Sequence, residues 1–231
     1  MSISENIKDI EEKIERAAIK SGRQRKDILL LAVSKTVECD RIKQAMECGL
    51  TSLGENKPQE IVRKYDELPG AKWHQIGHLQ TNKVKYIIDK VELIHSVDSL
   101  KLGEEIEKRA AKLGLRADVL VEVNIAGEES KHGVKPEETR ALIEEISKFD
   151  HVRVRGLMTV APFVPDPEEN RKYFGQMYKM FKDIGQCGYD NVSMDFLSMG
   201  MTNDYEVAIE EGANIVRIGT GIFGARNYDI K

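Results

Sequence analysis

The chain has few cysteines, no long apolar run and no excess of either charge, and each shortage excludes a class of protein. The three cysteines (Cys39, Cys48 and Cys187) are odd in number and form no C-x-x-C pair, so they indicate neither a disulfide framework nor a zinc site. This usage fits a reducing compartment. No segment reaches the roughly 20 apolar residues that span a membrane, and residues 1–20 lack the apolar core of a signal peptide. We therefore expect a soluble, cytoplasmic protein without a membrane partner.

The charge balance gives no reason to expect a nucleic-acid partner. The 35 lysines and arginines are outnumbered by 39 acidic residues, which gives a net charge of -4. Hydrophobic residues make up 41% of the chain and charged residues 32%, as is ordinary for a soluble globular protein. No linker or low-complexity tract interrupts the 231 residues, so we expect a single domain over residues 1–231.

Short β-rich segments alternate with amphipathic segments along the whole chain. The predicted strands are residues 27–36, 51–55, 72–77, 93–97, 117–125, 152–160, 193–199 and 214–219. The predicted helices are residues 4–21, 39–48, 58–67, 81–90, 99–113, 136–149, 168–184 and 205–211. Such alternation favours an α/β fold with a parallel sheet, and eight units in this length favour a closed (β/α)8 TIM barrel. The opening helix would either cover the bottom of the barrel or stand in for a missing eighth helix.

Lys35 follows the first strongly apolar run of the chain, residues 28–33. A lysine amine at a strand end is a candidate for Schiff-base formation with an aldehyde. The alternative is a lysine that only caps the strand and reaches solvent. Active sites of (β/α)8 barrels lie at the carboxyl ends of the strands, so Lys35 falls on the face where chemistry is expected.

Two glycine-containing strand ends predict a phosphate site. The seventh strand leads into S-M-G-M-T-N-D (198–204), and the eighth into R-I-G-T-G-I-F-G (217–224). Backbone N–H groups and hydroxyls in such turns suit an anion, and barrels bind phosphate after their last two strands. The G-x-G-x-x-G pattern is not a dinucleotide fingerprint, because no further strand and acidic residue follow it. For 198–204 the alternative is an ordinary helix cap with Asn203 as N-cap and Glu206 three residues later.

Arg217 lies two residues before Gly219, so the two residues share one face of the strand. If Gly219 faces a ligand, Arg217 points into the barrel mouth. A buried arginine needs an anion or hydrogen-bond acceptors, which marks this residue as a candidate for ligand binding. The alternative, a surface arginine, is disfavoured by the aliphatic residues around it.

The histidines predict no metal site. His74 and His78 are four residues apart, but Gly77 and the strand context break any shared helical face, and no H-E-x-x-H pattern exists. His95, His132 and His151 read as ordinary loop or strand-end residues.

Seven motifs together resemble the pyridoxal phosphate homeostasis proteins, and they occur in the family's order over nearly the whole chain. They are A-V-S-K-T (32–36), G-E-N-x-x-Q-E (54–60), W-H-x-I-G-x-L-Q-x-N-K (73–83), S-K-H-G (130–133), G-L-M-T (156–159), S-M-G-M-T-x-D (198–204) and R-I-G-T-G-I-F-G-A-R (217–226). The usual sixth motif is S-M-G-M-S-x-D. Thr202 replaces its second serine here and keeps a hydroxyl.

The resemblance implies a single barrel like the N-terminal domain of alanine racemase, holding pyridoxal 5'-phosphate (PLP) as an aldimine on Lys35. It further implies phosphate-holding residues after the last two strands, an arginine at the pyridine nitrogen and an asparagine near the ring. Methionines at two strand ends are added for their position, although methionines more often only pack. The expected cofactor-binding residues are Lys35, Asn56, Met158, Ser198, Met199, Arg217, Gly219 and Thr220.

The same resemblance implies cofactor carriage in PLP homeostasis without catalytic turnover. An arginine at the pyridine nitrogen leaves that nitrogen unprotonated, which weakens the ring as an electron sink. Racemisation also needs a second acid/base group, which alanine racemase takes from an additional β-domain. The chain stops soon after its eighth strand, so we expect that domain to be absent. Two alternatives stay open: a PLP-dependent racemase-like enzyme using Tyr205 or His78, and a phosphosugar enzyme in which Lys35 is incidental.

The expected partners are PLP itself and the PLP-dependent apo-enzymes that would receive it. Lys131, in a polar loop after the fifth strand, could accept the aldehyde transiently during such a transfer. Without the racemase β-domain one dimer contact is lost, so we expect a monomer.

Overall fold

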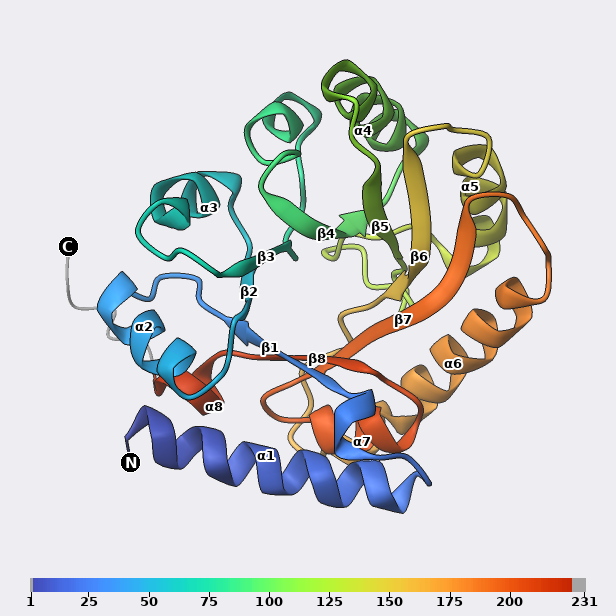
Figure 1. Cartoon of the computed structure of the whole chain (residues 1–231). Helices are drawn as coiled ribbons and strands as arrows, with labels where there is room; N and C mark the ends of the chain where they lie inside the picture. Colours follow the sequence, from blue (N-terminus) through green and yellow to red (C-terminus); the bar gives the residue numbers. More distant parts are fainter. Residues whose placement is uncertain (1, 226–231) are drawn as a thin grey trace.

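Eight parallel strands close into a barrel in the order of the sequence (Figure 1). The computed structural model describes residues 2–225, so Arg226, the last residue of the seventh motif, lies outside the described residues. The strands are β1 (Leu29–Val33), β2 (Ser52–Glu55), β3 (Lys72–Gln75), β4 (Val91–Val97), β5 (Ala117–Glu122), β6 (Val152–Met158), β7 (Val192–Met201) and β8 (Ile215–Ile218). β8 pairs with β1 in parallel, which aligns Arg217 with Leu31 and closes the barrel. The predicted (β/α)8 TIM barrel is confirmed.

Helices cover the outside of the barrel, as Figure 1 shows. The α-helices are α1 (Ile3–Lys20), α2 (Cys39–Glu47), α3 (Pro58–Tyr65), α4 (Leu100–Leu113), α5 (Thr139–Ile146), α6 (Arg171–Gly185), α7 (Tyr205–Glu210) and α8 (Thr220–Phe223). Short 3-10 turns are η1 (Arg25–Asp27), η2 (Thr81–Tyr86), η3 (Pro136–Glu138) and η4 (Pro167–Asn170). Within residues 2–225 we find no helix with the length and apolar character that a membrane crossing requires.

The opening helix α1 takes the place of the missing eighth helix. It starts with a capping box, in which Ser2 and Glu5 bond reciprocally to each other's backbone N–H, and it buries one stripe of isoleucines. α1 lies beside α2, α7 and α8 (Figure 1). It fills the place of a full eighth helix, since α8 is only four residues long. Asn6 Nδ2 donates to the Ile222 carbonyl over 2.9 Å and ties α1 to α8. Of the two predicted roles, standing in for the missing eighth helix is the correct one.

Three local predictions were wrong. Residues 81–90 form no α-helix: residues 81–86 are the 3-10 turn η2 and residues 87–90 are turn, in keeping with the β-branched Ile87 and Ile88 that follow η2. β1 ends at Val33, so Lys35 lies in the turn after the strand. The N-cap of α7 is Asp204 and not Asn203.

The barrel interior is apolar over part of its depth and polar over the rest. Leu31, Leu93, Leu120, Met158 and Ile215 form a buried cluster inside the barrel, separate from the larger core between strands and helices. The remaining interior positions include histidine, serine and arginine side chains. Because buried polar groups need partners, these side chains must bond to one another or to a ligand.

Candidate functional site

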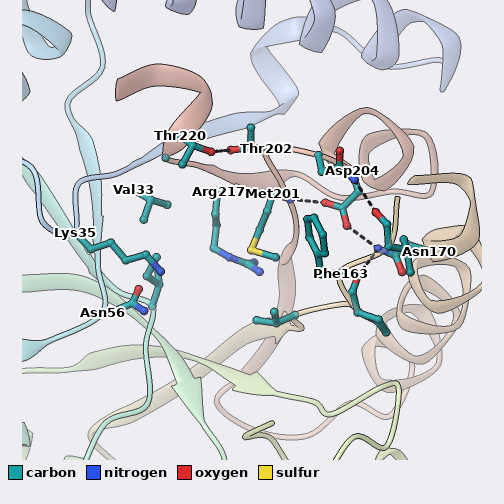
Figure 2. Close-up of a pocket in the computed structure, with 16 residues that line it drawn as sticks. Val33, Lys35, Asn56, Phe163, Asn170, Met201, Thr202, Asp204, Arg217 and Thr220 are labelled. Atoms are coloured by element: carbon teal, nitrogen blue, oxygen red, sulfur yellow. Dashed lines mark hydrogen bonds between the residues drawn. The ribbon is translucent and has the colours of Figure 1, made fainter. Parts of the chain in front are cut away.

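Five of the predicted residues line one pocket at the carboxyl ends of the strands. The pocket has a volume of about 510 Å³, within the range of small-molecule sites, and draws residues from the ends of β1, β2, β6, β7 and β8. Figure 2 shows Lys35 and Asn56 on one side, Arg217 in the middle and Thr202 with Thr220 above. The remaining predicted residue in the lining is Gly219. The pocket thus brings together groups that are up to 185 positions apart in the numbering.

A buried ion pair fixes the backbone just before Lys35. Lys64 of α3 donates to the Ser34 carbonyl over 2.9 Å and to Glu55 Oε1 over 2.7 Å. Ser34 Oγ donates to the same carboxylate oxygen, also over 2.7 Å. The side chains of Glu55 and Lys64 are fully buried. Burial raises the pKa of Glu55, while the charge of Lys64 and the two hydrogen bonds oppose that rise. Ser34 is therefore held through both its carbonyl and its hydroxyl.

The residue just after Lys35 is conformationally strained. Thr36 has φ 63°, a left-handed conformation that is unfavourable for a β-branched residue. Such strain persists only where surrounding contacts enforce it, and it is common at functional sites. The half-buried Lys35 is thus presented from a turn that is constrained on both sides.

Arg217 points into the barrel, as predicted, and is held by two neighbouring strands. Its Nη1 donates to Ser198 Oγ over 2.7 Å and its Nη2 donates to the Thr159 carbonyl over 2.8 Å. Burial lowers its pKa to about 10, against the opposing charges of Glu122 and Asp204, so it is still a cation at neutral pH. Guanidinium has five N–H donors, so donors remain for a ligand in the pocket.

A chain of neutral groups continues from Arg217 into the interior. His95 Nδ1 lies 3.0 Å from Ser198 Oγ, and His95 Nε2 lies 2.9 Å from His74 Nδ1. Burial lowers the pKa of His74 to about 4 and that of His95 well below its ordinary value, so both imidazoles are neutral. Among these hydrogen-bonded side chains, Arg217 is therefore the one cation, and Ser198 links it to the two histidines.

Two hydroxyls meet where a phosphate was predicted. Thr202 Oγ1 and Thr220 Oγ1 are 3.2 Å apart, one after β7 and one after β8, and both line the pocket. Asp204 shapes this turn, since its two carboxylate oxygens accept from the Met201 N–H and from Asn170 Nδ2 over 2.7 and 2.8 Å. The two threonines offer hydrogen-bond donors for an anion.

Known proteins are similar in sequence to this chain over almost its full length. Residues 5–227 match the family model of the alanine racemase N-terminal domain. The pyridoxal phosphate homeostasis protein of Aquifex aeolicus is 47% identical over 230 residues, covering 99% of this chain and 100% of the relative. The chain belongs to this family.

Solved structures agree with that assignment. PipY of Synechococcus elongatus, solved with PLP bound, superposes with a TM-score of 0.83 at 30% identity and covers 96% of this chain and 100% of its own. An alanine racemase of Clostridium difficile has a TM-score of 0.73 at 17% identity, with 99% of this chain and 58% of that chain covered, which shows a shared barrel fold.

Three of the predicted cofactor-binding residues do not line the pocket. Ser198 is buried and its hydroxyl accepts from Arg217, so its side chain positions the arginine. Met158 belongs to the apolar cluster inside the barrel, and Met199 to the core between strands and helices. A contact of these three with a cofactor stays a prediction.

The sequence analysis missed several residues of the site. Thr202 was noted only as a motif variation, although it is the partner of Thr220. Phe163 and Asn170 also line the pocket, and nothing in their own sequence context indicated this. Glu122, at the end of β5, is not part of the pocket lining but interacts with Arg217; it is buried, and its pKa is raised to about 7 by burial and by Asp98, while Arg217 opposes the rise. Because Phe163, Asn170 and Glu122 are brought to this region by tertiary contacts, no local sequence pattern could have identified them.

The two candidates for a racemase base, Tyr205 and His78, and the candidate transfer residue Lys131 lie outside the pocket. Tyr205 is buried, and burial together with the charges of Glu206 and Asp9 raises its pKa. His78 lies in the loop after β3, beside Asp98. Lys131 Nζ donates to Glu128 over 3.1 Å and to the Ala161 carbonyl over 3.1 Å, so it bridges two loops.

Proposed function

We propose that this chain binds PLP in the pocket at the barrel mouth, bonds it covalently through Lys35, and acts in PLP homeostasis as a carrier. The observation that carries the proposal is that an amine, a guanidinium and a pair of hydroxyls line the same pocket. The family assignment supports it, since relatives bear the homeostasis name and PipY was solved with PLP bound.

The donor set fits the three polar parts of PLP. Lys35 offers an amine for the aldehyde, Arg217 offers N–H donors for the ring nitrogen, and Thr202 with Thr220 offers hydroxyls for the phosphate. Apolar side chains complete the lining and would cover the ring; among them are Val33, Ile76, Val160 and Met201. Asn56, beside Lys35, adds an amide at the same side (Figure 2).

Bound PLP supplies an electron sink to an attached amino group, and Arg217 sets how strong that sink is. A guanidinium that stays protonated at neutral pH donates to the ring nitrogen and does not transfer its proton. Ser198 and Thr159 hold the guanidinium in place from two strands. We infer that this arrangement suits holding the cofactor better than promoting carbanion chemistry.

Within the described residues, the one carboxylate of the lining is already engaged in hydrogen bonds, and the lining contains no histidine or tyrosine. Its titratable members are Lys35, Asp204 and Arg217, and Asp204 is engaged by the Met201 N–H and by Asn170. Neither Tyr205 nor His78, the two candidates for a racemase base, is part of the lining. Carriage is therefore favoured over racemisation, for which a second proton-transfer group is required.

The test is the visible absorbance spectrum of the purified protein after incubation with PLP, followed by borohydride reduction and peptide mass mapping. We expect a visible band and a reduced pyridoxyl adduct on the peptide that contains Lys35. Lys35→Ala should lose the adduct and keep weaker, non-covalent binding. The matched control is Lys57→Ala, which removes an exposed lysine next to Asn56 and should leave the adduct unchanged. An equal adduct yield from Lys35→Ala would refute the proposal.

A further inference from the structure

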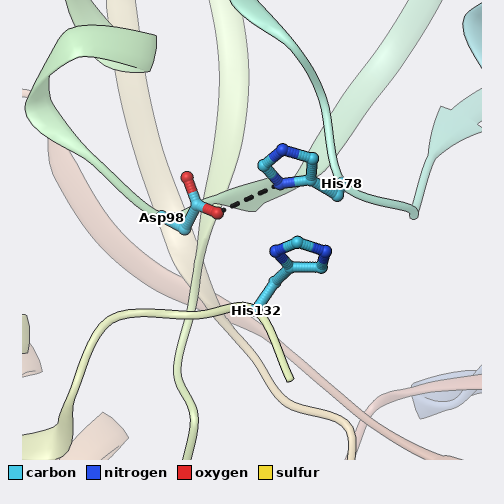
Figure 3. A group of neighbouring side chains, drawn as sticks. All are labelled: His78, Asp98 and His132. Atoms are coloured by element: carbon cyan, nitrogen blue, oxygen red, sulfur yellow. Dashed lines mark ion pairs between the residues drawn. The ribbon is translucent and has the colours of Figure 1, made fainter. Parts of the chain in front are cut away.

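Three side chains from three different loops meet at the barrel mouth, outside the proposed cofactor pocket. His78 follows β3, Asp98 follows β4, and His132 lies in the loop between β5 and α5 (Figure 3). One ligand atom of each lies within 4.8 Å of those of the other two. His78 Nδ1 is 3.3 Å from Asp98 Oδ2, and the two imidazoles are stacked with their centroids 4.0 Å apart.

The contacts among these groups do not by themselves explain why they converge. Asp98 is mostly buried, with 16% of its side chain exposed. Among residues 2–225 it forms one ion pair, the loose contact with His78, and its charge also acts on Glu122. The two rings lie almost parallel, at 12°, and closer than the roughly 4.5–7 Å usual for favourable ring pairs. Within residues 2–225, a mostly buried carboxylate with one loose ion pair and two closely stacked imidazoles thus meet at one place, as a set of donors suited to a cation.

Both histidines are presented from fixed backbone. A Cβ on Gly77, before His78, would lie 2.6 Å from the Asn56 carbonyl, so only glycine allows this close approach. A Cβ on Gly133, after His132, would lie 2.6 Å from the backbone nitrogen of Asn124.

The loop that carries His132 is further tied down on both sides. The Asn124 side chain donates to the Glu128 carbonyl over 2.9 Å, and the Val134 N–H donates to the Glu122 carbonyl over 2.8 Å. Lys131 bonds to the loop after β6. The backbone positions that bring His132 toward His78 and Asp98 are thus built into the fold.

We propose that His78, Asp98 and His132 bind a divalent first-row transition-metal ion, with Zn²⁺ as the best-suited probe. Two imidazoles and one carboxylate are a ligand set that zinc uses with a water in the fourth position. Zinc bonds of about 2.0–2.2 Å place tetrahedral ligands roughly 3.4 Å apart, so rotation of the two exposed rings must bring the donors closer. The ion would join the loops after β3, β4 and β5 across the rim of the barrel.

The test is isothermal titration of the 231-residue, tag-free chain with ZnCl2 after chelator treatment and desalting. We expect one saturable equivalent, weakened at least tenfold in each of His78→Ala, Asp98→Asn and His132→Ala. The matched control is His151→Ala, because His151 also pairs with a carboxylate, 2.8 Å from Glu107, and no third metal-ligating side chain joins this pair among residues 2–225. This control should bind as the wild type does.

Two further readouts separate metal binding from a folding defect. CoCl2 should give visible d–d bands without a thiolate charge-transfer band in the wild type, and the bands should disappear in His132→Gln. Zinc should raise the unfolding midpoint of the wild type and of Lys35→Ala equally, since the site is independent of the proposed cofactor lysine. Absence of saturable binding, or binding that all three ligand variants retain, would overturn the proposal.

Discussion

The buried pair of Glu55 and Lys64 holds the backbone before Lys35. Removing one of the two charges should lower the free energy of unfolding by more than removing both. Lys64→Met keeps an apolar stem of similar length and leaves Glu55 with the Ser34 hydroxyl as its remaining donor. Breaking a fully buried pair in this way costs about 3–5 kcal/mol in the free energy of unfolding. The cost should shrink toward low pH, because burial already raises the pKa of Glu55 and a protonated carboxyl needs no counter-charge.

Glu55→Gln should cost less, about 2–3 kcal/mol, since Lys64 keeps the Ser34 carbonyl at 2.9 Å and Glu60 at 3.2 Å. In Glu55→Gln/Lys64→Met neither charge is left buried, and the loss should be smaller than that of Lys64→Met alone. The two single effects therefore should not add, and the coupling energy should be roughly 2–4 kcal/mol.

The assay is urea unfolding followed by the fluorescence of Trp73, the single tryptophan of the chain, which is buried in β3. Glu38→Gln is the control, because Glu38 pairs with Arg63 over 3.4 Å at the surface and should contribute less than 1 kcal/mol. Both single variants of the buried pair should also slow formation of the borohydride-trapped adduct. Additive effects, or a loss below about 1 kcal/mol in Lys64→Met, would refute the reasoning.

Three more predictions concern the pocket and the interior. Glu122→Gln should change the pH dependence of the free energy of unfolding. The native pKa of Glu122, about 7, lies above the ordinary 4.5, so between these pH values the native state holds a proton that the unfolded chain releases. Wild-type stability relative to this variant should fall by roughly 3 kcal/mol from pH 4.5 to above pH 7 in chelator-containing buffer, and a flat difference would contradict the assigned pKa. Thr220→Val and Thr202→Val should each weaken PLP retention about fivefold, for about 1 kcal/mol per lost hydrogen bond, as measured by equilibrium dialysis; unchanged retention would remove them from the phosphate site. Ser198→Ala should cost about 1–3 kcal/mol in urea unfolding, because Arg217 loses a buried acceptor, and a smaller loss would mean that Thr159 suffices.

The barrel was predictable because its signal is repeated along the whole chain. Eight apolar segments alternate with amphipathic ones, and this pattern fixes a parallel sheet without knowledge of any single contact. The inward direction of Arg217 followed from its two-residue offset to Gly219 and its aliphatic neighbours. The prediction of an α-helix over residues 81–90 was wrong because an amphipathic pattern does not distinguish a short 3-10 turn from an α-helix.

The site was only partly predictable because side-chain partners depend on register between strands. Ser198 was predicted among the cofactor-binding residues, and the hydrogen bond of its hydroxyl with Arg217 of the neighbouring strand β8 could not be foreseen from the sequence. The pair of Glu55 and Lys64 joins a strand to the following helix, and no motif spacing marks it. Three loops had to be placed in space before His78 could be seen beside its two neighbours. Such contacts follow from barrel closure rather than from local sequence.

A crystal structure of the chain grown with PLP would test the central claim most directly. The account predicts continuous density from Lys35 Nζ to the cofactor, the phosphate beside Thr202 and Thr220, and the ring nitrogen facing Arg217. PLP bound elsewhere, or bound in this pocket with its aldehyde directed away from Lys35, would contradict it.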